Sequence, residues 1–329
     1  MNQKQLFGSR KDLNCSGNGT KVWSSQLVLG LGIPQLTINL ISVAFNCTVI
    51  FTIVSTKDLH KPIFVLFCNL AFSDLFTSSS GFWISVLFIT DPESTIFGSK
   101  DILIPYAFYT ISILSTIYNL VSIGIERYLA VAEGFRTRCR ISRNQALVAA
   151  LINWTLAFLL GGMPLMGWDC YKKENRSVLY SPLCIDYLIF ITIPNCVVAF
   201  ILPFFTYLSI IVILRKQKCA MKAHRQTLGA YKSAELQVAI TSIFIWLLAL
   251  VSYAPFFAGV ILDATMQLCP TGAYPSVFVF RNCTAMMITM NSLGNPIIYT
   301  LKVKNLGHKL KLLKCPSSNR IQVQAIGNR

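Results

Sequence analysis

The chain contains few charged residues, and acidic residues are fewer than half as many as basic ones. Only 13% of its 329 residues are charged and 54% are hydrophobic, whereas about a quarter of the residues in soluble domains are charged. This composition excludes most soluble cytosolic proteins and is typical of a chain embedded in lipid. The histidines, His60, His224 and His308, show no metal-ligand spacing and no pairing with a nucleophile. We therefore expect no enzyme activity.

Two further features are missing from the sequence. Residues 1–25 contain no apolar stretch followed by a small-residue cleavage site, so we expect no cleavable signal peptide and expect the first apolar run to insert the chain. The sequence shows no internal repeat and no pair of interrupted apolar runs, which argues against a channel or transporter. A single helical bundle is the simplest organisation.

Seven apolar runs are each long enough to cross the roughly 30 Å hydrocarbon core of a bilayer as a helix. The third and seventh are the most polar, and polar groups in such runs are common where they face other helices. The sequence therefore predicts an all-α membrane protein, a seven-transmembrane helix bundle with a short amphipathic eighth helix. The predicted division is a tail over 1–25, the bundle over 26–301, an interfacial helix over 302–315 and a second tail over 316–329. The seven runs cover residues 26–54, 62–90, 103–132, 145–167, 185–214, 236–264 and 275–301.

The net charge of +16 lies in the loops between these runs. In a soluble chain it would suggest nucleic acid, but with the N-terminus outside, 20 of the 29 Lys and Arg residues fall on the inner side. This bias predicts an extracellular N-terminus in the plasma membrane, and the basic inner loops match anionic membrane lipids. The residues around the first run alone favour the opposite orientation, because more Lys and Arg residues precede this run than follow it. Glycosylation sequons at Asn14, Asn18 and Asn175 fit the predicted orientation.

Three motifs on different runs carry polar groups to bilayer depth. Asp74 lies in the middle of the second run, where a carboxylate costs roughly 2.5–3.5 kcal/mol on insertion scales. Glu126-Arg127-Tyr128 ends the third run, and Asn295-Pro296-Ile297-Ile298-Tyr299 ends the seventh. Together with Asn46 and Trp154, this set resembles the rhodopsin-like G-protein-coupled receptors.

Within that family the chain is most similar to the branch of sphingosine-phosphate, lysophosphatidate and cannabinoid receptors. The similarity lies in Ile125-Glu126-Arg127-Tyr128, in the segment Leu160 to Cys170, and in Asn291-Ser292 before the last motif. Two departures from most rhodopsin-like receptors are shared with this branch. Ile102 replaces the usual cysteine of the third run, and the proline of the fifth run is displaced to Pro203.

The resemblance implies how the receptor would activate a heterotrimeric G protein. An inactive-state bridge from Arg127 to Glu235 would break as the sixth helix swings outward. The alternative is that Glu235 only stabilises the N-terminus of its helix. Tyr253 stands where the family usually has a tryptophan that senses the ligand. In this respect the sequence departs from the usual activation mechanism of the family. The residues implied in coupling are Glu126, Arg127, Tyr128, Tyr207, Glu235, Asn295, Pro296 and Tyr299.

The resemblance also implies an allosteric sodium ion, and no other cofactor is expected. Oxygen ligands suit this hard cation. The alternative is a water-filled polar network around a protonated Asp74. The residues that match the family's sodium pocket are Asp74, Thr116, Asn291, Ser292 and Asn295.

The cysteines are divided by compartment. The lipid-receptor branch implies a Cys170–Cys184 disulfide within the second outer loop, and the pairing of Cys269 with Cys15 or Cys283 stays open. Cys315 follows a basic amphipathic stretch, which predicts palmitoylation.

Missing groups exclude several ligand classes. Tyr109 replaces the carboxylate that binds amines, Thr289 replaces the lysine that binds retinal, and Val260 replaces the asparagine of adenosine receptors. Pro105 and Tyr106 replace the phosphate-binding pair of sphingosine-phosphate receptors.

An apolar, aromatic pocket remains, with an arginine at its mouth. It predicts a hydrophobic ligand, a lipid that is uncharged or has an anionic end on the arginine, although ordinary bundle packing explains any single aromatic equally well. The alternative is a chemosensory receptor for small organic molecules, since Leu59-His60-Lys61-Pro62-Ile63-Phe64 resembles a motif of odorant receptors. The predicted pocket residues are Tyr106, Tyr109, Ile113, Tyr253, Phe256, Phe257, Val260 and Arg281.

The C-terminal tail offers only Ser317 and Ser318 as neighbouring phosphorylation sites. We therefore expect weak phosphorylation-dependent recruitment of arrestin.

Overall fold

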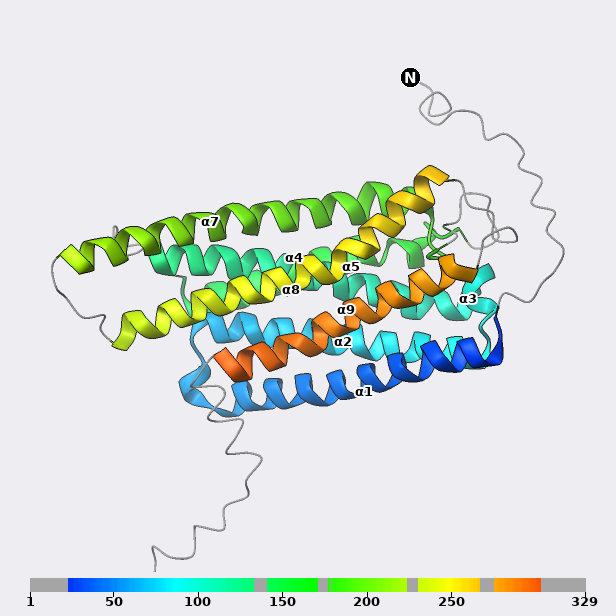
Figure 1. Ribbon diagram of the computed structural model, residues 1–329, viewed down its shortest axis with the longest axis horizontal. Helices are drawn as coiled ribbons and strands as arrows, with labels where there is room; N and C mark the ends of the chain where they lie inside the picture. The colour runs from blue at the N-terminus through cyan, green and yellow to red at the C-terminus, as the bar shows by residue number, and fades with distance from the viewer. Residues whose placement is uncertain are drawn as a thin grey trace, which may run out of the picture.

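The computed structural model describes residues 23–132, 141–170, 177, 179–223, 230–266 and 275–302. Seven long helices run along a common axis and form a bundle (Figure 1). A short α6 (Ile185–Tyr187) and a π-helical turn (Leu188–Thr192) lead directly into the fifth of them. The long helices are α1 (Ser25–Ser55), α2 (Pro62–Thr90), α4 (Lys100–Ala132), α5 (Arg143–Gly161), α7 (Ile193–Ala223), α8 (Ala230–Met266) and α9 (Pro275–Lys302).

The predicted seven-helix fold is confirmed. Six of the long helices are apolar enough to cross a membrane by length and composition, and α9 is the exception. Its polar residues explain the difference, because Asn291 and Asn295 are buried inside the bundle rather than turned to its surface. Apart from Lys302, which ends α9, the predicted eighth helix over 302–315 lies outside the described residues, as do the sequons and Cys315.

Local sequence determines where several helices begin and end. The Ser24 hydroxyl accepts a hydrogen bond from the Leu27 amide at the start of α1 (3.2 Å), and Ser142 with Gln145 forms a capping box at the start of α5. The predicted fourth run to residue 167 is too long. The helix ends at Gly161, and Pro164 lies in the separate 3₁₀ turn Met163–Met166 that follows.

Close helix packing depends on small residues, as is usual in membrane bundles. At the contact of α1 with α2, a Cβ on Gly81 would lie 2.7 Å from Asn39 Oδ1. The Ser78 hydroxyl donates to Ser42 Oγ across the same contact (2.7 Å). Large apolar side chains such as Leu40 and Leu151 lie exposed on the outside of the bundle, where lipid would cover them.

The approach of α5 to α4 generates a prediction about stability. A Cβ on Gly161 would lie 2.8 and 2.9 Å from the backbone Cα and N of Ile111, and backbone cannot move aside as a flexible side chain can. We expect Gly161→Ala to destabilise the purified protein by about 1–3 kcal/mol, measured as a lower midpoint of thermal unfolding.

Gly30→Ala is the matched control, because this exposed glycine of α1 has nothing within 4 Å of its added Cβ. It should leave the midpoint unchanged or raise it, since alanine favours helix. Equal midpoints for the two variants would contradict the close contact.

Candidate functional site

A cavity opens at the end of the bundle where α1 begins, here called the N-terminal end. It encloses about 600 Å³ of space, part of it open to solvent. Its wall comes from α1, α2, α4, α8 and α9 and from the segment between α5 and α7, and it is mostly aliphatic and aromatic. The lining residues are Gln35, Gly81, Ile84, Tyr106, Tyr109, Thr110, Ile113, Tyr180, Leu183, Leu188, Thr192, Phe256, Arg281, Thr284, Ala285 and Ile288.

The structure places some predicted pocket residues in this wall and others outside it. Tyr106, Tyr109, Ile113, Phe256 and Arg281 line the cavity. Arg281 is deeply buried, with 5% of its surface exposed, rather than at an exposed mouth.

The other three predicted residues follow a single stripe along α8, at positions 253, 257 and 260. Tyr253 and Val260 are fully buried. The Phe200 ring of α7 lies 6.3 Å from that of Tyr253 and 5.9 Å from that of Phe257. Tyr253 and Phe257 therefore pack α8 against α7, and Val260 is buried in the same apolar core.

The loop between α5 and α7 is attached to α8 by Asp263, which the sequence analysis missed. The Ser177 hydroxyl donates to Asp263 Oδ2 (2.5 Å), and the Leu179 amide donates to the same oxygen (3.2 Å). Asp263 is almost completely buried. Its sequence signal was an acidic residue near the end of an apolar run, but nothing in the sequence identified a partner 86 residues away.

This attachment places Tyr180 in the cavity wall. The ring of Tyr180 lies 4.9 Å from that of Phe256, and its hydroxyl donates to the Phe256 carbonyl (3.4 Å). Gly259 leaves room for it, since a Cβ there would lie 2.5 Å from the tyrosine oxygen. Burial raises the pKa of Tyr180 above its usual range. The side chain is therefore uncharged and packs between the loop and α8.

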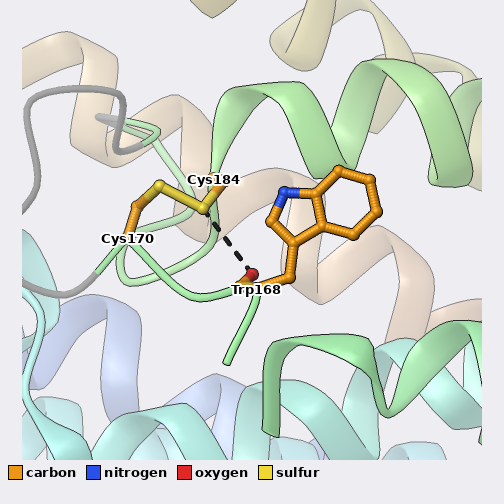
Figure 2. The surroundings of a disulfide bond; sticks show 3 residues. All are labelled: Trp168, Cys170 and Cys184. Carbon is orange, nitrogen blue, oxygen red and sulfur yellow. Dashed lines mark hydrogen bonds between the residues drawn. A yellow bond between two sulfur atoms is a disulfide. The ribbon is translucent and has the colours of Figure 1, made fainter. Parts of the chain in front are cut away.

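A disulfide closes the same loop, as expected. Cys170 and Cys184 are bonded, with their Cα atoms 4.9 Å apart. Figure 2 shows the bond beside Trp168, whose carbonyl oxygen lies 3.6 Å from the Cys184 sulfur. The Cys170 amide also donates to the Pro182 carbonyl (3.1 Å). These contacts hold the loop compact next to the cavity. Cys283 is a free thiol among the described cysteines.

At the opposite end of the bundle, Arg127 forms a buried ion pair with its neighbour Glu126. Arg127 Nη2 donates to Glu126 Oε1 (2.6 Å) and Nε donates to Oε2 (2.5 Å), in a bidentate geometry. Tyr128, the next residue, lies at the surface. The predicted Arg127–Glu235 bridge involves a side chain outside the described residues.

Two tyrosines predicted to take part in activation are buried in this half. The Tyr207 ring lies 5.8 Å from that of Trp246 on α8, and the Tyr299 ring stacks on Phe67 at 4.8 Å. Pro296 lies within α9, one turn before Tyr299. The two hydroxyls have no hydrogen-bond partner among the described residues.

Asp74 lies at the centre of a buried polar cluster. Asn295 Nδ2 donates to Asp74 Oδ2 (2.8 Å), and the Thr116 hydroxyl donates to Ser73 Oγ (3.0 Å). Several buried oxygens have no partner in the described part of the chain: Asp74 Oδ1, Asn291 Oδ1, Ser292 Oγ and Asn295 Oδ1. One carboxylate with neutral oxygens is a donor set that fits a hard monovalent cation. The described residues contain no cluster of three or more His, Cys, Asp or Glu that could hold a metal ion.

Comparison with known proteins identifies the family. The profile of the family described as "7 transmembrane receptor (rhodopsin family)" matches residues 45–299. The chain belongs to this family. It is therefore a multi-pass membrane receptor and not an enzyme, and the resemblance noted in its sequence is confirmed.

Curated relatives of this receptor include lysophosphatidic acid receptors. Lysophosphatidic acid receptor 1-B of Xenopus laevis is 28% identical over 292 residues, which cover 88% of this chain and 76% of the relative. Lysophosphatidic acid receptor 1 of Homo sapiens is 26% identical, covering 88% and 77%. The crystal structure of squid rhodopsin matches with a TM-score of 0.72 at 20% identity, covering 88% of this chain and 86% of that one. The last match supports the fold alone.

The close contact between Tyr180 and Gly259 predicts that a second substitution restores the stability lost through a first one. Gly259→Ala should lower the thermal stability by about 1–3 kcal/mol, because the added methyl group meets the tyrosine hydroxyl. Adding Tyr180→Phe removes that oxygen and should restore most of the loss. Thermal unfolding of both single variants and the double variant gives the coupling energy. Additive effects would show that the hydroxyl does not occupy this gap.

Proposed function

We propose that this receptor binds a hydrophobic small molecule, a lipid, in the cavity at its N-terminal end. Binding then activates a heterotrimeric G protein through outward movement of α8. The single observation that carries the proposal is the cavity wall, in which aliphatic and aromatic side chains surround one charged residue, Arg281, among the described residues. Burial of apolar surface is the main source of affinity such a wall offers. Similarity to lysophosphatidic acid receptors favours a lipid over an odorant.

The proposed path from the cavity to the G protein runs along α8. Phe256 lies in the cavity wall, and Pro255 beside it removes a backbone hydrogen bond and permits a bend. Further along the helix, Trp246 packs on Tyr207 of α7. A ligand that displaces Phe256 would change this bend and so loosen the packing near Arg127. Glu126, Arg127, Tyr128, Glu235, Asn295, Pro296 and Tyr299 complete the proposed switch.

The proposal extends to orientation and to the ion. The N-terminal end faces the outside of the plasma membrane, with residues 1–25 as its outer tail and 302–315 and 316–329 on the inner side. A sodium ion held at Asp74, Asn291, Ser292 and Asn295, beside Thr116, would neutralise the buried carboxylate and stabilise the inactive bundle.

Coupling is tested without any ligand. Glu235→Ala should raise basal G-protein activation several-fold in cells, because it removes the partner proposed to hold Arg127. A panel of Gα reporters measures the signal and identifies the Gα class. The control is Glu93→Ala, which removes an exposed carboxylate at the N-terminal end and should leave the basal signal unchanged. Equal signals from both variants at equal surface expression would count against the restraint.

Ligand binding in the cavity is tested by filling it. Ala285 lines the cavity on α9, so Ala285→Phe should lower the potency of activating lipids at least about tenfold, equivalent to about 1.4 kcal/mol. In the Glu235→Ala background the same change should keep the raised basal signal, which shows that the protein is folded and coupled. Ala258→Phe, on the exposed face of α8, is the size-matched control. Unchanged lipid potency in Ala285→Phe would overturn the proposed site.

A further inference from the structure

The charged residue of the cavity is buried without an acidic partner. Arg281 Nη1 donates to the Thr95 carbonyl (2.7 Å) and Nη2 to Thr95 Oγ1 (3.1 Å), and its guanidinium lies 5.7 Å from the centre of the Phe278 ring. No Asp or Glu of the described residues pairs with it. Only 5% of the residue is exposed.

An arrangement of this kind leaves a positive charge uncompensated in an apolar setting. Buried charges are normally paired, because desolvation of an isolated ion is costly. Neutral oxygens such as those of Thr95 accept hydrogen bonds but do not neutralise the cation. Arginine has five N–H donors, and two donate to Thr95, so the guanidinium has donors left for an anion within the cavity.

A second polar group in the same wall has no hydrogen-bond partner in the described part of the chain. Gln35 of α1 lines the cavity and is 4% exposed. Its amide makes no hydrogen bond with any of the described residues and lies in the cavity wall. Its NH₂ group offers two donors and its carbonyl oxygen an acceptor to a ligand in the cavity. Because α1 and α9 lie side by side (Figure 1), Gln35 and Arg281 approach the cavity from neighbouring helices.

We propose that Arg281 and Gln35 form a head-group site for a single carboxylate, with the acyl chain of the ligand lying along the aromatic wall. This inference rests on the proposed lipid receptor function and names the class of lipid. One arginine balances one carboxylate, whereas a phosphate monoester carries about 1.5–2 negative charges. The second charge would find no cation in the described wall. The Gln35 amide donates to the second carboxylate oxygen or to a neighbouring polar group of the ligand.

The head-group site predicts a rank order among lipids that share one chain. The probes are oleate, oleyl alcohol and oleoyl lysophosphatidate, added to the purified full-length receptor in nanodiscs. Affinity is measured from the concentration dependence of the thermal unfolding midpoint, since a ligand that binds the folded state raises it. Oleate should bind at least about tenfold more tightly than either other probe.

Two variants assign this preference to the proposed residues. Arg281→Gln should remove the preference for oleate over oleyl alcohol. Gln35→Glu places a competing carboxylate in the same cavity wall as Arg281, so it should weaken oleate at least about tenfold and leave oleyl alcohol within about threefold. Thr37→Val, a polar-to-apolar change on the exposed face of the same helix, is the control and should change neither affinity.

A double variant tests the position of the charge. If Arg281→Gln unfolds because it loses the Thr95 contacts, Gln35→Glu still tests the site. In a folded Arg281→Gln protein, adding Gln35→Arg returns the cation from the neighbouring helix and should restore part of the oleate preference.

The outcomes separate this inference from the function on which it rests. Tighter binding of the lysophosphatidate than of oleate would overturn the carboxylate assignment, as would oleate affinity that Gln35→Glu leaves unchanged. If oleate and oleyl alcohol bind equally and neither variant matters, the lipid-binding function stands and the head-group site falls. If no probe binds the wild-type receptor and no lipid activates it in cells, the proposed function itself fails and this inference with it.

Discussion

The structure depends on one constraint, namely that a polar group buried in a lipid-embedded bundle must find its partner within the bundle. Backbone groups meet this requirement inside each helix, so side chains are left to join helices to one another. Asn69 of α2 donates to Asn119 of α4 and accepts from the Trp154 indole of α5. Asp263 joins the loop before α7 to α8 in the same way. These contacts give an otherwise uniform apolar interior a specific arrangement.

Two of the places where described residues do not meet this requirement are the sites proposed to bind a ligand and an ion. Around Asp74, several buried oxygens have no partner among the described residues. In the described part of the cavity wall, no carboxylate pairs with Arg281 and no residue hydrogen-bonds to the Gln35 amide. Unsatisfied buried groups are costly, and a ligand or an ion bound at these two sites would satisfy those that lie there. One site would recognise the head of a lipid, and the other would respond to an ion and to the bend of α9 near Pro296. Both sites include polar residues of α9, and among the described long helices this is the one not apolar enough to count as a membrane span by composition.

Much of this architecture could be predicted from residue patterns. The apolar runs located all seven helices, with α1, α2, α4 and α9 within three residues at both ends, whereas ends of α5, α7 and α8 differ from the prediction by six to nine residues. The disulfide of Cys170 with Cys184 followed from the family resemblance. Errors arose where a tertiary contact decided the outcome. The aromatics of α8 looked equivalent in sequence, yet Phe256 faces the cavity whereas Phe257 packs on Phe200. Successive residues of a helix point about 100° apart, so two neighbouring aromatics can face a cavity and another helix, respectively.

The sequence by itself determined the membrane class, the number of spans and the receptor family, because these follow from hydropathy and from motifs that are local in the chain. Only the tertiary structure decided which side chains share a cavity. Tyr180 is placed in its wall by an anchor to Asp263, and Gln35 is brought to it by the packing of α1 along α9. Such contacts join residues far apart in sequence, and their partners depend on helix rotation and close packing at small residues, which no local pattern encodes.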